Sequence, residues 1–245
     1  MDTPESIPVL KRIHAKRLRE VYRSAGWPYQ DLVEIELLAA GLLEQVVEPT
    51  GHVIVRLTES GLRHVAQSAD QNRQARTAHE NLVELVARNM QREGRIVWTG
   101  LSLRARVTTT DGDGQWKWCM SDVFSIRNSS VEKYLEPVVH EIKVNRADLL
   151  GDLKRPEKRQ AYLDVGGQCW YVLGLDGKGR HIGKENEIPE ECGVMVKTDT
   201  GLEVVRMAPK RPSPRLPFSV WMTLAKSVPM ARENERYGRS FFTNT

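Results

Sequence analysis

The stretch that decides the fold reads MSDVFSIR at residues 120–127 and VVHEIKVNRADLLGDLK at residues 138–154. Both parts contain an apolar run typical of a buried strand, and each run is interrupted by charge: Asp122 in the first, Glu141 and Lys143 in the second. Side chains alternate between the two faces of a strand, so Glu141 and Lys143 point to one side and Ile142 to the other. A charged pair in such a place is costly unless something compensates it.

A bound cation and an anionic ligand would compensate these charges. The carboxylates of Asp122 and Glu141 and the backbone carbonyl of Ile142 offer hard oxygen ligands, which suit Mg²⁺ or Mn²⁺ better than Zn²⁺. Such an ion acidifies a bound water and stabilises charge on a phosphate under attack. Lys143 could hold that water or stabilise the transition state.

The alternative for any E-x-K triplet is a surface ion pair on an edge strand. Three features favour the catalytic interpretation here. The second strand is apolar on both sides of the pair, Asp122 lies 19 positions before Glu141 near another apolar run, and a helix containing Glu80 precedes both.

The pattern around these strands alternates between helices and strands. It predicts an amphipathic helix at residues 77–93, strands at 96–107, 116–127, 137–144 and 169–175, and a hairpin formed by 193–198 and 202–207. Residues 111–114 (DGDG) predict a turn, residues 146–164 a helix broken at Pro156, and residues 219–237 a last helix.

The first part of the chain has a different organisation. A helix is predicted at residues 7–25, ending at Gly26, and Asp31 can cap a second helix with Glu34 at capping-box spacing. Gly41 breaks this run, a turn and strand follow at 48–58, and another helix begins within 57–67. This order resembles a winged helix-turn-helix. The polar residues 69–76 predict a linker between a domain at 1–68 and a domain at 77–245.

The candidate recognition segment of that unit, residues 33–45, is acidic and contains no Lys or Arg. DNA contact and protein contact or domain packing therefore both stay open for this domain. The basic residues of the first helix could contact phosphates, although a solvated helix face is the favoured interpretation.

Composition predicts a soluble cytoplasmic protein. The 245 residues carry a net charge of +4 with a pI of about 9.0, which fits a polyanion as partner. The three cysteines form no CxxC pair, which argues against a disulfide framework or a cysteine-rich zinc site. The start lacks the apolar region of a secretory signal, and no apolar run approaches the length of a membrane span.

The order of these elements resembles the PD-(D/E)XK nuclease superfamily, in which an acidic helix precedes a hairpin with Asp and a strand with E-x-K. More narrowly, residues 77–235 resemble the MmcB-type DNA repair proteins. The matching segments are EIKVNRADLLGDLK (141–154), KRQAYLDVGGQCWYVL (158–173), IPEECGVMV (188–196) and LEVVRMAPKR (202–211). The chain departs from that family's pattern at Val144-Asn145 and at Arg155-Pro156.

The resemblance implies a restriction-endonuclease-like mixed sheet flanked by helices, preceded by the small winged-helix-like domain. It implies that Asp122 and Glu141 bind Mg²⁺ or Mn²⁺ and that Lys143 is the catalytic lysine. It also suggests supporting positions around the site, namely Asp148, Asp152, Lys154 and Tyr162.

Glu80 is a further candidate, binding metal through water or orienting Lys143, with an exposed helical Glu as the equal alternative. Gln160 falls where related nucleases place a polar residue behind the site, and helix packing is the alternative for Gln160 and Tyr162. A basic stripe could contact DNA phosphates or form a solvated face: Arg146, Lys154, Arg155, Lys158 and Arg159. Trp116 and Trp118 could stack on bases, but core packing is favoured.

The sequence thus predicts a metal-dependent deoxyribonuclease that acts in DNA repair or mobile-element defence. The first alternative is a nuclease-fold DNA-binding protein without turnover, and the second is a module that recruits a protein partner through its N-terminal domain. The preferred form of DNA, and whether the chain acts as a homodimer, stay open.

Overall fold

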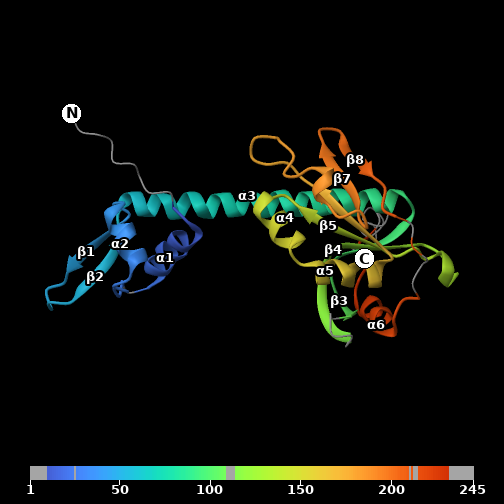
Figure 1. The fold of residues 1–245 in the computed structure, drawn as a ribbon, viewed down its shortest axis with the longest axis horizontal. Helices are drawn as coiled ribbons and strands as arrows, with labels where there is room; N and C mark the ends of the chain where they lie inside the picture. The colour runs from blue at the N-terminus through green and yellow to red at the C-terminus, as the bar shows by residue number, and fades with distance from the viewer. Residues whose placement is uncertain (1–9, 25, 109–113, 210, 212–214, 232–245) are drawn as a thin grey trace, which may run out of the picture. The chain divides into compact units, whose positions relative to one another are not determined.

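A computed structural model of the chain describes residues 10–24, 26–108, 114–209, 211 and 215–231. The chain divides into two compact units, an N-terminal unit (residues 1–74) and a C-terminal unit (residues 75–245). The division falls inside one continuous helix, α3 (Glu59–Arg92), which is seen along its length in Figure 1. Residues 69–76, predicted as a linker, are therefore helical. They are polar but contain no Gly or Pro that would interrupt helical hydrogen bonding.

The N-terminal unit contains two helices and a hairpin before α3: α1 (Arg12–Arg23), α2 (Leu32–Ala39), β1 (Leu43–Val47) and β2 (Val53–Leu57), with the two strands antiparallel. Its small core is formed by Leu18, Val21, Leu37, Leu42, Leu43 and Val55. The predicted N-cap is confirmed, because the Asp31 side chain accepts the backbone N–H of Glu34.

The reciprocal half of the predicted capping box does not form in this unit. The Glu34 carboxylate is buried and accepts the backbone N–H of Tyr29 instead, at 2.6 Å. The candidate recognition segment at 33–45 is also only partly helical, since α2 ends at Ala39. The chain then passes through Gly41, with a positive φ of 66°, and enters β1.

The C-terminal unit is built on a six-stranded mixed sheet in sequence order. The strands are β3 (Arg95–Thr108), β4 (Gly114–Arg127), β5 (Val138–Lys143), β6 (Gln168–Leu173), β7 (Gly193–Thr198) and β8 (Gly201–Arg206). Strands β5, β6 and β7 are parallel, and the remaining pairs are antiparallel. Each predicted strand is confirmed, while most of the predicted DGDG turn lies outside the described residues.

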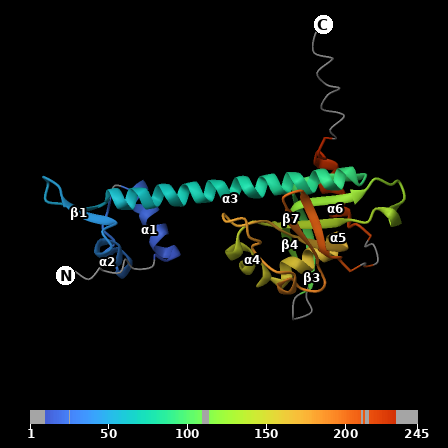
Figure 2. The same cartoon turned by 90° about the horizontal axis from the view of Figure 1, so that it is seen from above.

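Helices cover both faces of this sheet. The unit contains α4 (Arg146–Leu153), α5 (Pro156–Gly166) and α6 (Phe218–Lys226), with 3-10 turns η1 (Glu132–Tyr134) and η2 (Glu185–Glu187). Leu82, Val86 and Met90 of α3 pack on one face, and α5 and α6 pack on the other. Figure 2 shows α3 along one side of the strands and α4 and α5 on the opposite side.

Prolines explain two helix boundaries, the start of α5 and the end of α6. Pro156 is the first residue of α5, so the predicted break separates two helices. The last helix was predicted at 219–237 but ends at Lys226, because Pro229 follows closely and the residue before a proline avoids helical geometry. Residues 232–237 lie outside the described part.

A kink in the β3–β4 pair sets the direction of the side chains next to the site. Val97 packs toward α3, whereas Leu101 and Leu103 join the core on the α5 side, although a regular strand would keep all three on one face. The change occurs at Gly100, whose φ is +62°. Asp122 stands opposite Gly100, since Thr99 pairs with Val123 and Leu101 pairs with Ser121.

The close approach of β6 and β7 gives a test of this packing. A Cβ added at Gly193 would lie 2.4 Å from a ring carbon of the buried Trp170. We therefore expect Gly193→Ala to lower the free energy of unfolding by about 1–3 kcal/mol, measured by urea denaturation of the full chain. Gly177→Ala is the control, because nothing lies within 4 Å of its added Cβ. Equal loss in both variants would contradict the packing described.

Candidate active site

The two charged residues of β5 lie on the same face of the sheet, as their spacing predicts. Glu141 and Lys143 are 3% and 4% exposed, and both reach toward helices α4 and α5. Ile142 points the other way, into the core beneath α3. All six residues of β5 are buried, so this charged pair is not on an exposed edge strand.

Strand β4 brings Asp122 to the same place. Its Oδ2 accepts the backbone N–H of Ile142 at 2.7 Å. The amide and carbonyl of one strand residue point to the same side of the strand, so the Ile142 carbonyl also faces the side where Asp122 lies. The structure thus brings together the two carboxylates, the carbonyl and the lysine that the sequence singled out.

A charge cluster, defined here as Glu141, Lys143, Asp148, Asp152 and Lys158, fills the space between β5 and the two helices. The ammonium group of Lys143 lies 2.7 Å from Glu141 Oε1, 3.2 Å from Asp148 Oδ2 and 3.5 Å from Asp152 Oδ1. Lys158 of α5 lies 2.5 Å from the same Glu141 oxygen and 2.7 Å from Asp152 Oδ1. Both lysines therefore share one carboxylate oxygen.

Burial and mutual contact set the ionisation of the charge cluster. Burial raises the pKa of Glu141, and the positive charges of Lys143 and Lys158 oppose that rise. For Lys143, burial lowers the pKa, but the adjacent Glu141 and Asp152 carboxylates outweigh it and leave the pKa raised. The pKa of Lys158 is raised on the same balance. Both lysines are therefore held in the charged form.

Asp152 is the second buried acid of the charge cluster. Burial acts to raise its pKa, but the hydrogen bond from Lys158, the charge of Lys143 and the hydrogen bond from Tyr171 lower it overall. The Tyr171 hydroxyl donates to Asp152 Oδ2 at 2.8 Å. Asp152 is thus held as a carboxylate that positions both lysines.

The residues present fit a divalent cation. Glu141 Oε2 is buried and has no hydrogen-bond partner among the described residues, so one oxygen remains for a ligand. With Asp122 included, four carboxylates face two ammonium groups, which leaves an excess of negative charge. No group of three or more His, Cys, Asp or Glu side chains in the described chain is placed to hold a metal. The ligand set that the sequence predicts contains two such side chains, Asp122 and Glu141, together with the Ile142 carbonyl, and it stays a prediction.

The residue of α3 that lies near Asp122 is a histidine, the neighbour of the candidate Glu80. His79 Nε2 lies 3.4 Å from Asp122 Oδ1. Glu80 instead pairs with Arg76 on an exposed part of α3, at 2.9 Å. His79 and Glu80 both line a pocket of about 510 Å³ beside Asp122. The other lining residues are Val83, Glu84, Thr99, Gly100, Met120 and Met230. Glu80 therefore borders the site without contacting its charged groups.

Gln160 does not reach the site. It is exposed and donates to Asp164, one turn further along α5. Lys158 and Tyr162, four residues apart, share the helix face that looks at the sheet, and Gln160 between them points away. Tyr162 is fully buried and its hydroxyl donates to the Met120 carbonyl at 2.6 Å, so it ties α5 to β4.

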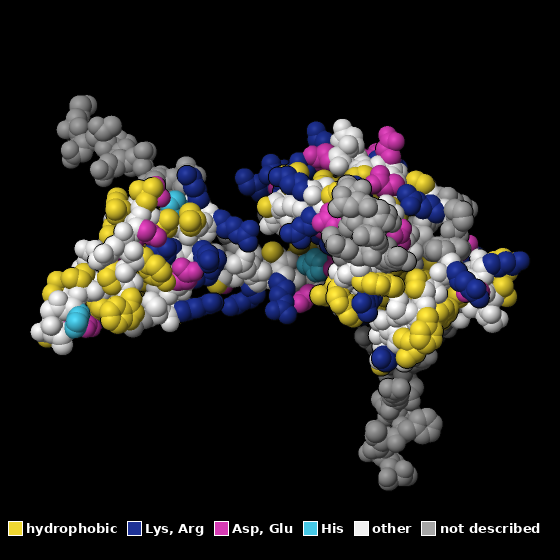
Figure 3. Space-filling model, turned by 60° about the horizontal axis from the view of Figure 1, so that its bottom comes forward, with side chains coloured by type: hydrophobic (Ala, Val, Ile, Leu, Met, Phe, Trp, Pro, Cys, Tyr) yellow, Lys and Arg dark blue, Asp and Glu magenta, His cyan; other side chains and the backbone are white. Residues whose placement is uncertain are grey.

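The predicted basic stripe is divided in the structure. Arg146 pairs with Glu187, Arg159 pairs with Glu191, and Lys158 belongs to the charge cluster. Lys154 and Arg155 are exposed, and neither has an ion pair with any other described residue. On the face drawn in Figure 3, Lys and Arg side chains are interspersed with Asp and Glu.

Sequence reasoning assigned Lys158 to phosphate binding and gave His79 no role. Lys158 could have been recognised, because it lies at helical spacing from Ala161, Tyr162 and Val165, on the apolar face of α5. A lysine on that face must meet a buried acid. No sequence pattern around His79 predicted its contact with Asp122, because that contact depends on the kink at Gly100, opposite Asp122.

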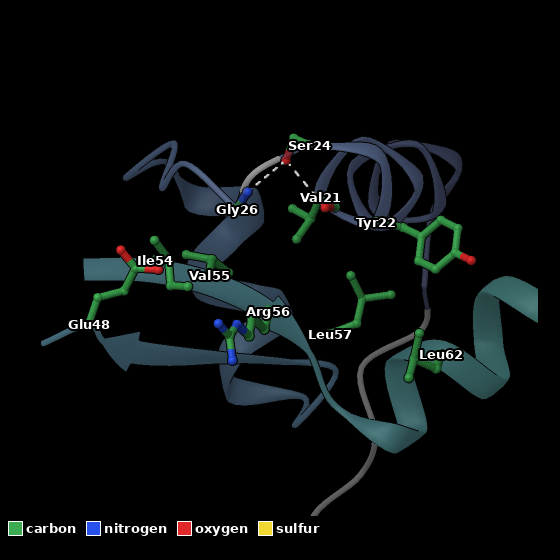
Figure 4. A pocket seen from close by; sticks show the side chains of 10 residues that line it. All are labelled: Val21, Tyr22, Ser24, Gly26, Glu48, Ile54, Val55, Arg56, Leu57 and Leu62. Atoms are coloured by element: carbon green, nitrogen blue, oxygen red, sulfur yellow. Dashed lines mark hydrogen bonds between the residues drawn. The ribbon is translucent and has the colours of Figure 1, made fainter. Parts of the chain in front are cut away.

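The N-terminal unit has a pocket of its own, of about 300 Å³. Figure 4 shows Ser24 bridging the end of α1 and Gly26, with its Oγ bonded to the Val21 carbonyl and the Gly26 amide. Its lining mixes apolar side chains with Glu48 and Arg56. Arg56 is the one basic residue among the described residues that line this pocket.

Comparison with known proteins finds no matching protein family and no similar curated protein. One solved structure is similar, described as the SPO1766 protein of unknown function from Silicibacter pomeroyi. The similarity has a TM-score of 0.41 and 21% sequence identity, and covers 61% of this chain and 82% of that chain. No helix in the described ranges combines the length and apolarity needed to cross a membrane.

The charge cluster predicts that replacing Lys158 destabilises the fold much more than replacing the nearby Lys154. Lys158→Met leaves Asp152 and Glu141 with one ammonium group in a buried place. We expect this variant to lose about 2–3 kcal/mol of unfolding free energy in urea denaturation. Lys154→Met removes an exposed lysine and should change stability by less than about 0.5 kcal/mol. Similar values for the two variants would contradict the described role of Lys158.

The contact between His79 and Asp122 predicts a pH dependence in metal-free protein. The contact with Asp122 raises the pKa of His79 against the opposing effect of partial burial. A raised folded-state pKa adds stability that is complete below the unfolded value of about 6.5 and is lost as pH rises through the folded value. We expect His79→Asn to cost more stability at about pH 5.5 than at about pH 9.

Urea denaturation at both pH values, with a chelator present, measures this difference. His181→Asn, at an exposed position, gauges the effect of removing an imidazole that has no acidic partner among the described residues. A His79→Asn cost that is equal at the two pH values would show that the contact with Asp122 is not an ion pair.

Proposed function

We propose that the C-terminal unit is a metal-dependent deoxyribonuclease of the PD-(D/E)XK type, with Asp122, Glu141 and Lys143 as its active-site core. The observation that carries this proposal is the convergence of these groups where the C-terminal end of β5 lies beside the middle of β4, with Asp122 bonded to the Ile142 amide at 2.7 Å. The sequence resemblance to MmcB-type DNA repair proteins supports a role in DNA repair or mobile-element defence.

The proposed metal ligands are the carboxylates of Asp122 and Glu141 and the carbonyl of Ile142. When bound there, Mg²⁺ or Mn²⁺ would acidify a water and stabilise charge on the scissile phosphate. Asp122 stands opposite Gly100 and bonds the Ile142 amide of β5. The lysines hold Glu141 by one oxygen, and its Oε2 has no hydrogen-bond partner among the described residues. The chain's own contribution is thus to fix two acids in place before any ligand arrives.

Lys143 has an electrostatic role in this proposal. Neighbouring carboxylates raise its pKa, so the metal-free site holds it protonated. A protonated lysine beside the site can stabilise the added negative charge of the phosphate in the transition state. Asp152 and Asp148 would hold it in place, at 3.5 and 3.2 Å from its ammonium group.

The alternative is a nuclease-fold DNA-binding protein without turnover. One observation favours it: both lysines already contact Glu141 Oε1, so this acid is partly neutralised without a metal. The two proposals differ in metal binding. An active site should bind Mn²⁺ in a way that depends on Glu141, whereas an inactive one should bind it no better than the Glu141→Gln variant does.

Cleavage assays test the proposal directly. Wild-type protein with Mg²⁺ or Mn²⁺ is incubated with supercoiled, linear duplex and single-stranded DNA, and products are resolved on gels. We expect Asp122→Asn, Glu141→Gln and Lys143→Met each to reduce the cleavage rate by about 100-fold or more, because each removes a group that acts on the transition state. A chelator should abolish cleavage.

Asp176→Asn is the matched control, since this half-buried carboxylate pairs with Arg180 and not with the charge cluster. It should cleave like wild type. Equal rates for the Glu141→Gln variant and wild type would assign the activity to a contaminant and reject the proposal. Calorimetry with Mn²⁺ and uncleaved DNA separates an inactive binding protein from a protein that does not engage DNA.

A further inference from the structure

Beyond the kink, β3 and β4 continue as a two-stranded ribbon, defined here as residues 101–108 and 114–121. Strand β5 pairs with β4 only from Val123 to Ser125, so this part of β4 pairs with β3 alone. One face of the ribbon is covered on the α5 side, where Leu103 and Ser121 are fully buried and Cys119 is 4% exposed. No helix of the described residues covers the other face, where Trp118 and Met120 are exposed.

An aromatic stripe, defined here as Trp116, Trp118, Met120 and Arg104, occupies the uncovered face. Trp118 is 74% exposed, Met120 63% and Trp116 50%, at alternate positions of β4. The Arg104 guanidinium lies 5.0 Å from the centre of the Trp116 ring, and Arg104 pairs with Trp118 in the register. The core packing predicted for Trp116 and Trp118 is therefore wrong, because α5 covers the opposite face.

This stripe leads into the candidate active site. Met120 and Asp122 occupy successive alternate positions of β4, and both line the pocket of about 510 Å³ beside α3. Apolar side chains such as Val83 and Met230 line this pocket together with His79. A ligand that contacts the stripe along β4 would therefore reach the Asp122 carboxylate at the end of the stripe.

We propose that the aromatic stripe stacks the unpaired bases of single-stranded DNA and leads the strand to Asp122. This inference rests on the proposed function, in which DNA is the substrate. Exposed indole faces suit stacking with any base, and bases are available for such stacking only where they are unpaired. The guanidinium beside the rings adds a cation for the backbone and a planar group for stacking.

The position of the stripe favours this occupant over a protein partner. Trp, Met and Arg are also common at protein interfaces, so these residue types alone do not decide between the two. Arg104 lies over the Trp116 ring and pairs with Trp118 in the register, and the stripe continues along β4 to Asp122, a proposed metal ligand. Indole rings next to a guanidinium and to that acid match a polyanion that carries aromatic bases.

Binding without metal tests the stripe separately from catalysis. Fluorescence anisotropy of the full chain in a chelating buffer compares oligodeoxythymidine of about 12 nucleotides with an abasic oligomer of equal length and charge. We expect wild type to prefer the thymidine oligomer. Trp118→Ala should weaken thymidine binding by about tenfold and leave binding of the abasic oligomer unchanged. Trp118→Phe, which keeps a ring, should retain most of the preference.

Phe218→Ala is the control, because this ring is 78% exposed at the start of α6 in the same unit. It should bind both oligomers like wild type. Circular dichroism confirms that each variant is folded. Equal binding of both oligomers by wild type overturns the stripe proposal, and so does a Trp118→Ala variant that binds the thymidine oligomer like wild type. A Trp118→Ala variant that changes its oligomeric state while its DNA binding is unaltered also overturns it, because the stripe would then contact protein.

The two proposals fail in different ways. A wild-type protein that cleaves DNA but shows no preference for unpaired bases rejects the stripe and keeps the nuclease. A protein whose thymidine preference depends on Trp118, but which cleaves nothing with any metal, supports the stripe and rejects the nuclease.

Discussion

Two ammonium groups share a single oxygen of Glu141 inside the core of the C-terminal unit, and much of the surrounding structure serves that contact. Strand β5 is buried along its length, so a charge placed on it has no access to water. Helices α4 and α5 bring Asp152 and Lys158 to the same face, and Tyr171 of the next strand completes the hydrogen bonds of Asp152. Without these partners, the Glu141–Lys143 pair would be too costly to bury.

Such a cluster is poor evidence for selection on stability. Buried ion pairs are often no more stabilising than apolar side chains of similar volume. A sheet centre of Val, Ile and Leu would fold as well and would need no matched helix partners. Functional sites often gather charged groups whose pKa values are shifted by burial and by one another. The charge cluster between β5, α4 and α5 has this property, which supports a chemical role for it.

The elements that follow simple periodicity were predictable from sequence. The alternation of β5 placed Glu141 and Lys143 on one face, and the apolar runs located each strand. The phase of α3 was harder to predict: Glu80 was a candidate because of its charge, yet the neighbouring His79 contacts Asp122. The predicted linker at residues 69–76 includes the point where the two units divide, and it is helical because a polar sequence without Gly or Pro is well suited to an exposed helix. The pattern of Trp116 and Trp118 fixed their common face, but only the tertiary position of α5 decided that this face stays open.

The kink at Gly100 connects the charge cluster with the open face of the ribbon. A regular β3–β4 pair would keep the side chains of Val97 and Leu101 on one face, and the core beneath α3 and the core beneath α5 could not both be filled from this pair. By changing faces at Gly100, the pair fills both cores and turns Asp122 toward the Ile142 amide. The same change directs Trp118 and Met120 outward, along a line that ends at Asp122. One local departure from strand geometry therefore fixes both the acid of the candidate site and the surface that leads to it.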